Sequence, residues 1–332
     1  MTKPFIINRD ALVHDRVRLT DKIDIPKHID DIEAGINECF VNQGFQVVQH
    51  GRVIALRGTD VGRLSSAFKA GVYLGKYDDL TNTTRFLSKM VKAGHSYEPI
   101  RGENILFLFI GTGKPVYDHM VTYTVGRPTR IAGGQRANLP WGFEVPTELK
   151  GDSSKFFNAG LESVDYIIDL TKQSDGEMGQ HQIQVARSLL PVGYVMPPFL
   201  MEFTEEALVK SVFKQRLWEK GAQGATVDII NDMWQCVLQL DQEKWETLLD
   251  YHGPHTDRWA KAMRTLRDKP VTFDEFTIEL RKHLGLTLPD GFMNLTEEEL
   301  RAEHEILRNT DIYDFVLNKF GKLPLNMWEK KQ

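Results

Sequence analysis

The chain has 332 residues, of which 41% are hydrophobic and 26% are charged, a composition typical of a globular protein with one large domain or two modest ones. Its formal net charge of -5 provides no general attraction to nucleic acid or to an anionic membrane. It has two cysteines without CxxC spacing, no signal peptide and no run of about 20 apolar residues, so we expect a cytoplasmic protein.

The first third of the chain predicts a helix, a hairpin and two further helices. Residues 1–45 are mostly polar and are expected to form an N-terminal extension containing one helix at 29–40, where isoleucines recur at helical spacing. Residues 45–56 read as two short strands around a His-Gly turn. Residues 60–74 and 83–92 each have a helical pattern of apolar or small side chains.

The middle of the chain predicts one buried strand and several helices. Residues 105–110 are β-branched and aromatic, as in a buried strand, and residues 115–125 begin with a proline that suits a helix start. Residues 127–143 are rich in Gly, Pro and Arg and are predicted to be a loop that wraps a ligand. Helices are expected at 160–170 and 179–190.

Helix capping residues mark the remaining elements. Thr204 is a suitable N-cap for a helix over 205–218, and an amphipathic helix follows at 227–240. Thr272 and Thr296 are predicted to open two later helices, and Gly285 to end the first of them. We therefore expect a main domain at 46–265 and a helical C-terminal extension at 266–332.

Several motifs are set aside. The segment Gly111-Thr-Gly-Lys-Pro115 lacks the first glycine and the Ser or Thr of a phosphate loop. His252 and His255 are separated by Gly-Pro, which prevents a helical metal-binding pair, and no metal site is predicted. No Ser or Cys lies in a nucleophile-elbow pattern, so acyl transfer has no support.

Three arginines are the candidate binding residues: Arg136 in the Gly-rich loop, Arg187 before a proline, and Arg216 in a largely apolar helix. Each on its own is more often a solvated charge or a structural ion pair than a ligand contact. The planar guanidinium is, however, well suited to phosphate and to the carbonyl edge of a base. Their spacing alone does not show that they converge.

The order of motifs between about Gln46 and Gln235 resembles that of the flavin-dependent thymidylate synthases. The matching segments are Val48–Leu56, Phe86–His95, Glu103, Phe107–Phe109, Gly134-Gln135-Arg136, Ala186-Arg187-Ser-Leu-Leu190-Pro191, Gln215-Arg216 and Ala222-Gln223. The resemblance covers roughly 190 residues. Each segment is weak by itself, and the common order and spacing carry the resemblance.

The resemblance implies an α+β fold, with a mixed sheet flanked by helices, assembled as a homotetramer with sites at subunit interfaces. It implies reductive methylation of dUMP to dTMP, with methylenetetrahydrofolate, FAD and NADPH. The implied substrate-binding residues are Gln135, Arg136, Arg187 and Arg216, with Arg216 also catalytic because it would stabilise charge on the pyrimidine ring. The implied cofactor-binding residues are His95, Glu103, Arg127 and Arg130.

The sequence departs from the family on the flavin side. The hallmark Arg-His-Arg falls on Thr124-Val125-Gly126, the serine beside the substrate on Gly134, and the glutamine before the hallmark on Val121. An Asn and an Arg that help to hold the flavin fall on Glu205 and Ala207. Two alternatives therefore stay open: hydroxymethylation of dCMP or dUMP without net hydride transfer, and a catalytically silent homologue that binds nucleotide or only partner subunits.

Overall fold

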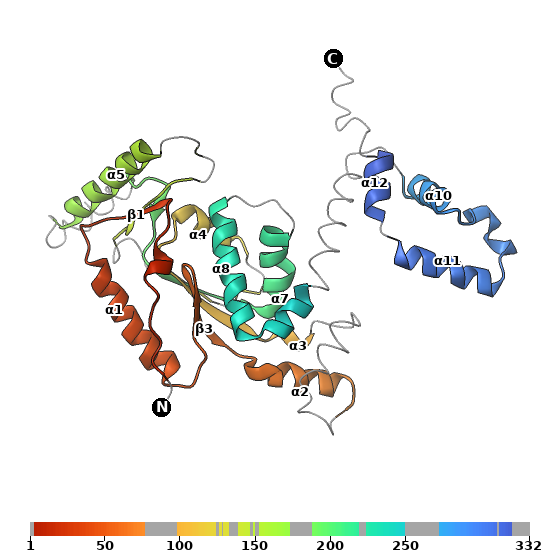
Figure 1. Cartoon of the computed structure of the whole chain (residues 1–332), viewed down its shortest axis with the longest axis horizontal. Helices are drawn as coiled ribbons and strands as arrows, with labels where there is room; N and C mark the ends of the chain where they lie inside the picture. The colour runs from red at the N-terminus through yellow and green to blue at the C-terminus, as the bar shows by residue number, and fades with distance from the viewer. Residues whose placement is uncertain are drawn as a thin grey trace, which may run out of the picture. The chain divides into compact units, whose positions relative to one another are not determined.

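The chain divides into two compact units, Met1–Gly253 and Pro254–Gln332 (Figure 1). The computed structural model describes residues 3–76, 98–123, 126–127, 129–132, 139–146, 149, 153–172, 188–218, 224–249, 272–310 and 312–320. The predicted domain boundaries stay a prediction.

A five-stranded sheet organises the first unit. Its strands lie in the order β2 (Val48–His50), β3 (Val53–Gly58), β4 (Asn104–Phe109), β8 (Phe199–Thr204) and β5 (Thr129–Ala132). Every pair in it is antiparallel. The α+β class is confirmed, whereas the expected mixed sheet is wrong for the strands that the structure describes.

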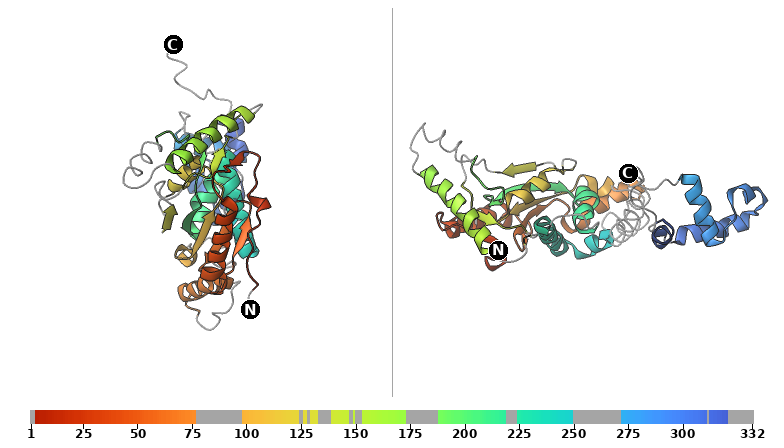
Figure 2. Two further views of the ribbon diagram at one scale, coloured as in Figure 1. Left: turned by 90° about the vertical axis from the view of Figure 1, so that its left-hand side faces the viewer. Right: turned by 90° about the horizontal axis from the view of Figure 1, so that it is seen from above.

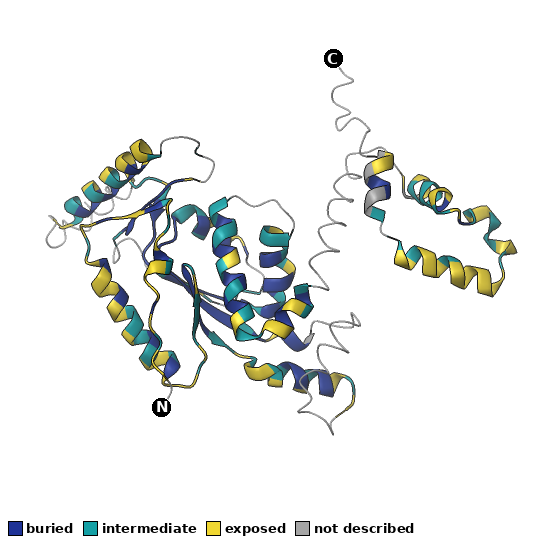
Figure 3. Cartoon of the chain, in the orientation of Figure 1, coloured by how far each residue is buried: buried dark blue, intermediate teal, exposed yellow. Residues whose placement is uncertain are grey.

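Both faces of this sheet are covered, because successive side chains of the central strands alternate between two cores. Ile54 and Leu56 of β3 pack in the core that includes helix α1 (Ile25–Ile36). Val53 and Ala55 of the same strand pack in the core that includes α8 (Gly224–Leu240) and the π-helix η5 (Leu208–Trp218). The sheet therefore lies between α1 on one side and α8 on the other (Figures 1 and 3).

Local capping explains where several helices begin. The Asp24 side chain accepts a hydrogen bond from the Lys27 backbone N–H at 3.1 Å, and Pro26 occupies the first turn of α1. Thr204 caps the short helix α7 (Glu205–Ala207), which continues directly into η5. The end of strand β8 thus sets the start of the helix that carries Arg216.

A second, three-stranded antiparallel sheet consists of β1 (Val17–Leu19), β6 (Gly142–Glu144) and β7 (Tyr194–Val195). Helix α5 (Ser154–Lys172) packs on β6 at one end of the unit (Figure 2). Phe143 of β6 fits between two glycines: a Cβ on Gly160 would lie 2.4 Å from the ring, and one on Gly193 would lie 2.8 Å from it. The absence of side chains at these two positions therefore permits the packing of α5.

A buried ion pair joins the two sheets. Arg52 Nη1 lies 3.0 Å from Glu144 Oε1 and also donates a hydrogen bond to the Gly111 carbonyl. The other carboxylate oxygen of Glu144 accepts the backbone N–H of Gly113. This network fixes the loop after β4, which the sequence had presented as an incomplete phosphate-loop motif.

The second unit is helical where described. It contains α10 (Phe273–Leu284), a 3₁₀-helix η6 (Pro289–Asn294), α11 (Glu297–Asn309) and α12 (Ile312–Phe320). Thr272 and Thr296 form capping boxes with the glutamates three residues later, and Gly285 ends α10 at a φ of 69°. These predicted helix boundaries are confirmed.

The helices predicted at 29–40, 60–74, 115–125, 160–170 and 227–240 are confirmed with shifted ends, and the loop predicted at 127–143 is wrong. The remaining described elements are η1 (Asp10–Leu12), the π-helix η2 (Asn37–Val41), η3 (Val61–Arg63), α2 (Leu64–Tyr73), α3 (Glu98–Arg101) and α4 (Lys114–Val121). The loop predicted over 127–143 contains β5 and part of β6, because pairing with β8 and β1 makes strands of residues whose own composition favours a loop. The predicted helix at 83–92 and most of that at 179–190 lie outside the described residues.

No helix in the described part of the chain has the length and apolar character needed to cross a membrane.

Candidate nucleotide site

Arg216 lies in the last turn of η5 and is held by an aromatic side chain. Its Nε donates a hydrogen bond to the Tyr123 hydroxyl at 2.6 Å, and its guanidinium carbon lies 5.7 Å from the centre of that ring. Burial raises the pKa of Tyr123 above its usual value, while Arg216 acts in the opposite direction. Tyr123 therefore stays a neutral phenol at physiological pH and accepts the hydrogen bond.

Arg216 stands at the border between the apolar core and solvent. It is intermediate in exposure, whereas Val212 and Phe213 of the same helix are fully buried. Interactions of a charge at such a border are less screened than in water. Nη1 and Nη2 make no hydrogen bond to a residue that the structure describes.

Two further arginines follow the end of α4. Arg127 Nη1 donates a hydrogen bond to the Met120 carbonyl at 3.2 Å, near the C-terminal end of that helix. Burial lowers the pKa of Arg127 from its ordinary value, and the nearby positive charge of Arg130 lowers it further. Arg130 lies on β5 and is exposed.

These three arginines have no carboxylate partner among the described residues. Arg127 and Arg216 are both anchored to residues at the end of α4, Met120 and Tyr123, so two guanidinium groups lie near one end of one helix. Unneutralised guanidinium groups are suited to phosphate and carbonyl oxygens. The described part of the predicted site is therefore cationic.

Glu103 is a buried side chain with several donors already in place. Its carboxylate accepts hydrogen bonds from the hydroxyls of Thr59 and Ser65 and pairs with Lys69. Burial raises its pKa, and the hydrogen bonds from Lys69, Ser65 and Thr59 outweigh burial, so the net shift is downward. Glu103 thus joins α2 to the start of β4 in this structure, and its predicted flavin contact stays a prediction.

The other predicted site residues lie outside the described residues: His95, Gln135, Arg136 and Arg187. The convergence of Arg136 and Arg187 with Arg216 therefore stays a prediction. Two features went unnoticed in the sequence: the Tyr123 anchor, and a buried cluster of Asp60, Glu205 and Lys244. No local pattern marks either feature, since their members lie from 39 to 184 residues apart.

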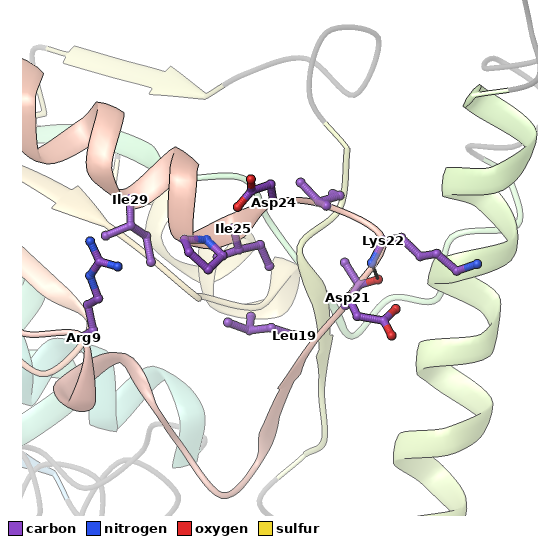
Figure 4. Close-up of a pocket in the computed structure, with 10 residues that line it drawn as sticks. Arg9, Leu19, Asp21, Lys22, Asp24, Ile25 and Ile29 are labelled. Carbon is purple, nitrogen blue, oxygen red and sulfur yellow. Dashed lines mark hydrogen bonds between the residues drawn. The ribbon is translucent and has the colours of Figure 1, made fainter.

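A broad hollow of about 630 Å³ lies beside the N-terminal segment, between residues 19–24 and the first turns of α1 (Figure 4). Three of its charged groups have structural partners: Lys22 pairs with Asp169 at 3.0 Å, Asp24 caps α1, and Arg9 pairs with Asp30. We assign it no ligand. Among the described residues, no group of three or more His, Cys, Asp or Glu side chains is placed to hold a metal ion.

No family model matches the chain, and no curated protein matches it. Solved structures that are similar to it include two of one enzyme. One is a UMP/dUMP methylase, PolB from Streptomyces cacaoi, bound with 5-Br dUMP, at 13% identity and a TM-score of 0.45 over 63% of this chain and 98% of that chain. The other is the same methylase bound with 5-Br UMP, at 11% identity and a TM-score of 0.45 over 63% of this chain and 97% of that chain.

Proposed function

We propose that this protein binds a pyrimidine deoxynucleoside monophosphate and transfers a one-carbon unit to C5 of its base. The observation that carries the proposal is Arg216: a half-buried guanidinium anchored by Tyr123, with two nitrogens free of described partners. The resemblance of the motifs between residues 46 and 235 supplies the substrate class.

In this proposal Arg216 faces a carbonyl of the base. C5 is nucleophilic when the ring has enolate character, with negative charge on the carbonyl oxygen, and a guanidinium already fixed in position stabilises that charge without reorganising. Tyr123 would hold Nε of Arg216 and so orient the guanidinium group with Nη1 and Nη2 toward the ligand. Arg136, Arg187 and Gln135 would hold the phosphate and sugar.

The proposed default reaction is reductive methylation of dUMP with methylenetetrahydrofolate as the one-carbon donor. Arg127 and Arg130 fit the phosphates of a flavin cofactor, because their guanidinium groups have no described carboxylate partner. When bound, FAD would supply the hydride, with NADPH as its reductant. Glu103 fits less well, since three donors already engage its carboxylate. Homo-oligomerisation, with sites shared between subunits, is part of the proposal.

The test is calorimetric titration of dUMP and dCMP into wild type, Arg216→Ala and Arg216→Lys, followed by turnover with the folate donor. Arg216→Ala is expected to lose about 3 kcal/mol of transition-state stabilisation, roughly a hundredfold in rate. Arg216→Lys is expected to restore little, because an ammonium does not reproduce the planar fork.

Arg301→Ala is the matched control, because Arg301 is an exposed arginine that pairs with Glu297 on the same helix. It is expected to match wild type. Unchanged nucleotide affinity and turnover in Arg216→Ala would refute the role of Arg216. The product separates the chemical alternatives: a methylated base supports hydride transfer, a hydroxymethylated base supports addition of water, and nucleotide binding without product supports a silent homologue.

A further inference from the structure

A second cavity lies beside the N-terminal segment and has a volume of about 280 Å³. It adjoins the broad hollow of Figure 4, with which it shares Arg9, Leu19 and Ile29. Ile29 of α1 and Ile110, which follows β4, both line it and both belong to the core on the α1 side of the five-stranded sheet. Arg216 lies on η5, which packs in the core on the other side of that sheet. The proposed nucleotide chemistry therefore does not use this cavity.

The wall of the cavity is largely apolar. Leu12 and Val17 line it from the N-terminal segment and are 6% and 7% exposed. Trp141 lines it from the loop before β6, and its ring stacks on His28 with the ring centres 5.9 Å apart. An ordered water needs two to four polar partners, and a wall of this kind supplies few. An apolar ligand would therefore replace water that is poorly held.

The two arginines of the wall are directed to other partners. Arg9 pairs with Asp30 of α1. The guanidinium carbon of Arg18 lies 4.5 Å from the centre of the Phe157 ring on α5. Neither guanidinium group is therefore available to an anion in the cavity.

The histidine of the wall is neutral. His14 Nδ1 accepts a hydrogen bond from the backbone N–H of Arg16 at 3.2 Å. Burial lowers the pKa of His14, and the positive charges of Arg52 and Arg16 lower it further, although Asp15 and Asp228 act in the opposite direction. The described wall of the cavity thus favours an uncharged ligand over an ion.

The volume and the opening of the cavity suit a small ring system. An apolar cavity of about 150 Å³ stays dry and holds benzene. This cavity, at about 280 Å³, is nearly twice as large and has room for two fused rings. Val13 also lines it and is 80% exposed, so the cavity reaches the surface and a ligand can enter without unfolding of the core.

We propose that this cavity binds a small uncharged aromatic molecule of one or two fused rings, at a site separate from that of the nucleotide. A planar ring buries a large apolar area and has no internal rotation to lose on binding, in contrast to an aliphatic chain. A phosphate group would find no free donor in the described wall, so a nucleotide does not fit this chemistry. The proposal does not depend on the nucleotide function.

The experiment is a titration of 5-fluoroindole into the full chain, followed by ¹⁹F NMR. Saturable binding with a Kd on the order of 1 mM or tighter is expected. Indole should displace the probe, whereas indole-3-carboxylate should bind at least about tenfold more weakly, because its charge would be desolvated without a partner. An excess of dUMP should leave the probe bound, since Arg216 lies across the sheet.

Three results would overturn the proposal without any variant. They are no saturation up to about 10 mM probe, which is tenfold above the expected limit, displacement of the probe by dUMP, and binding of the carboxylate as tight as that of indole. Binding of dUMP itself is measured separately by calorimetry. A failure of one proposal is therefore distinguishable from a failure of the other.

Two variants test the location. Ile29→Trp places a larger side chain in the cavity and is expected to weaken binding of 5-fluoroindole at least about tenfold. Ile306→Trp is the matched control, because Ile306 lies on α11 of the second unit and is 46% exposed. Val17→Thr keeps the shape of the wall and adds a hydroxyl that holds water, so it is expected to weaken binding several-fold. Equal affinity in wild type and folded Ile29→Trp would overturn the proposal, as would equal affinity in Val17→Thr if the tryptophan variant does not fold.

Discussion

Replacing Glu205 with glutamine is expected to change how the stability of the first unit depends on pH. The pKa of Glu205 rises from 4.5 to about 7 on folding, because burial disfavours its ionised form. An acid with a raised folded-state pKa costs no stability below about pH 4.5, and it costs progressively more as pH rises to about 7. A shift of about 2.5 units, at 1.36 kcal/mol per unit, corresponds to about 3 kcal/mol. Solvent screening does not reduce this free energy, because Glu205 is only 4% exposed.

The assay is urea unfolding at pH 5 and pH 8, monitored by the fluorescence of the buried Trp234 and Trp245. Relative to wild type, Glu205→Gln is expected to gain about 2–3 kcal/mol in the free energy of unfolding between these two pH values, because part of the full shift is already present at pH 5. Subtracting the free energy of unfolding of wild type from that of the variant cancels the contributions of other titrating groups. One of these is His14, the pKa of which is lowered by burial. Glu206→Gln is the control: hydrogen bonds from Arg101 and Lys210 outweigh burial and hold the pKa of Glu206 below its usual value. The stability that ionised Glu206 contributes is lost only below about pH 4.5. The difference in stability between Glu206→Gln and wild type should therefore be the same at pH 5 and pH 8. If Glu205→Gln and wild type differ in stability by the same amount at pH 5 and at pH 8, the pKa of Glu205 is not raised by folding.

Four further outcomes are expected. Tyr123→Phe should weaken nucleotide binding by about 1 kcal/mol, because it removes only the hydroxyl that holds Arg216; unchanged affinity in calorimetry would count against the anchor. Gly126→Ala should destabilise the first unit by about 1–3 kcal/mol, since the residue has a φ of 71° and a Cβ would lie 2.6 Å from atoms of Thr204 and Ala207; an unchanged melting temperature would contradict this. Thr296→Ala should cost about 1 kcal/mol of stability through loss of the capping box of α11, read from the thermal loss of its helical circular dichroism. Light scattering should give a mass above that of the 38.0 kDa chain, and a monomer at micromolar concentration would argue against shared sites.

The elements that the sequence predicted best are those specified by their own residues. The isoleucines of α1 recur at helical spacing, and Thr204, Thr272 and Thr296 act as caps within one turn of the helices they open. Strand β4 is apolar on both faces because both faces of the sheet are covered. Such features need no knowledge of distant partners.

The elements that were missed depend on distant partners. Strand β5 has exposed Arg130 and Ile131, so its sequence carries no alternating apolar pattern, and its hydrogen bonds to β8 define it as a strand. The Tyr123–Arg216 contact spans 93 residues and the Asp60–Lys244 pair spans 184. Neither Glu205 nor Lys244 stands out in sequence, because burial alone distinguishes them from surface charges. Arg216 stood out in the sequence as an arginine in a largely apolar helix, the family resemblance implied its role, and its anchor emerged only from the fold.

The fit of Phe143 between Gly160 and Gly193 links three positions in the evolution of this chain. A side chain at Gly160 would overlap only the ring, so it would be tolerated with a smaller residue at 143. A Cβ at Gly193 would also lie 2.7 Å from the backbone carbonyl oxygen of Glu144, so a smaller residue at 143 would not make room for it. We therefore expect residues 143 and 160 to vary together and residue 193 to stay glycine, although the three positions lie in β6, in α5 and in the turn before β7. In diverged relatives, the joint presence of two glycines and one aromatic residue at this spacing would align the α5 region even where its surface residues share no identity.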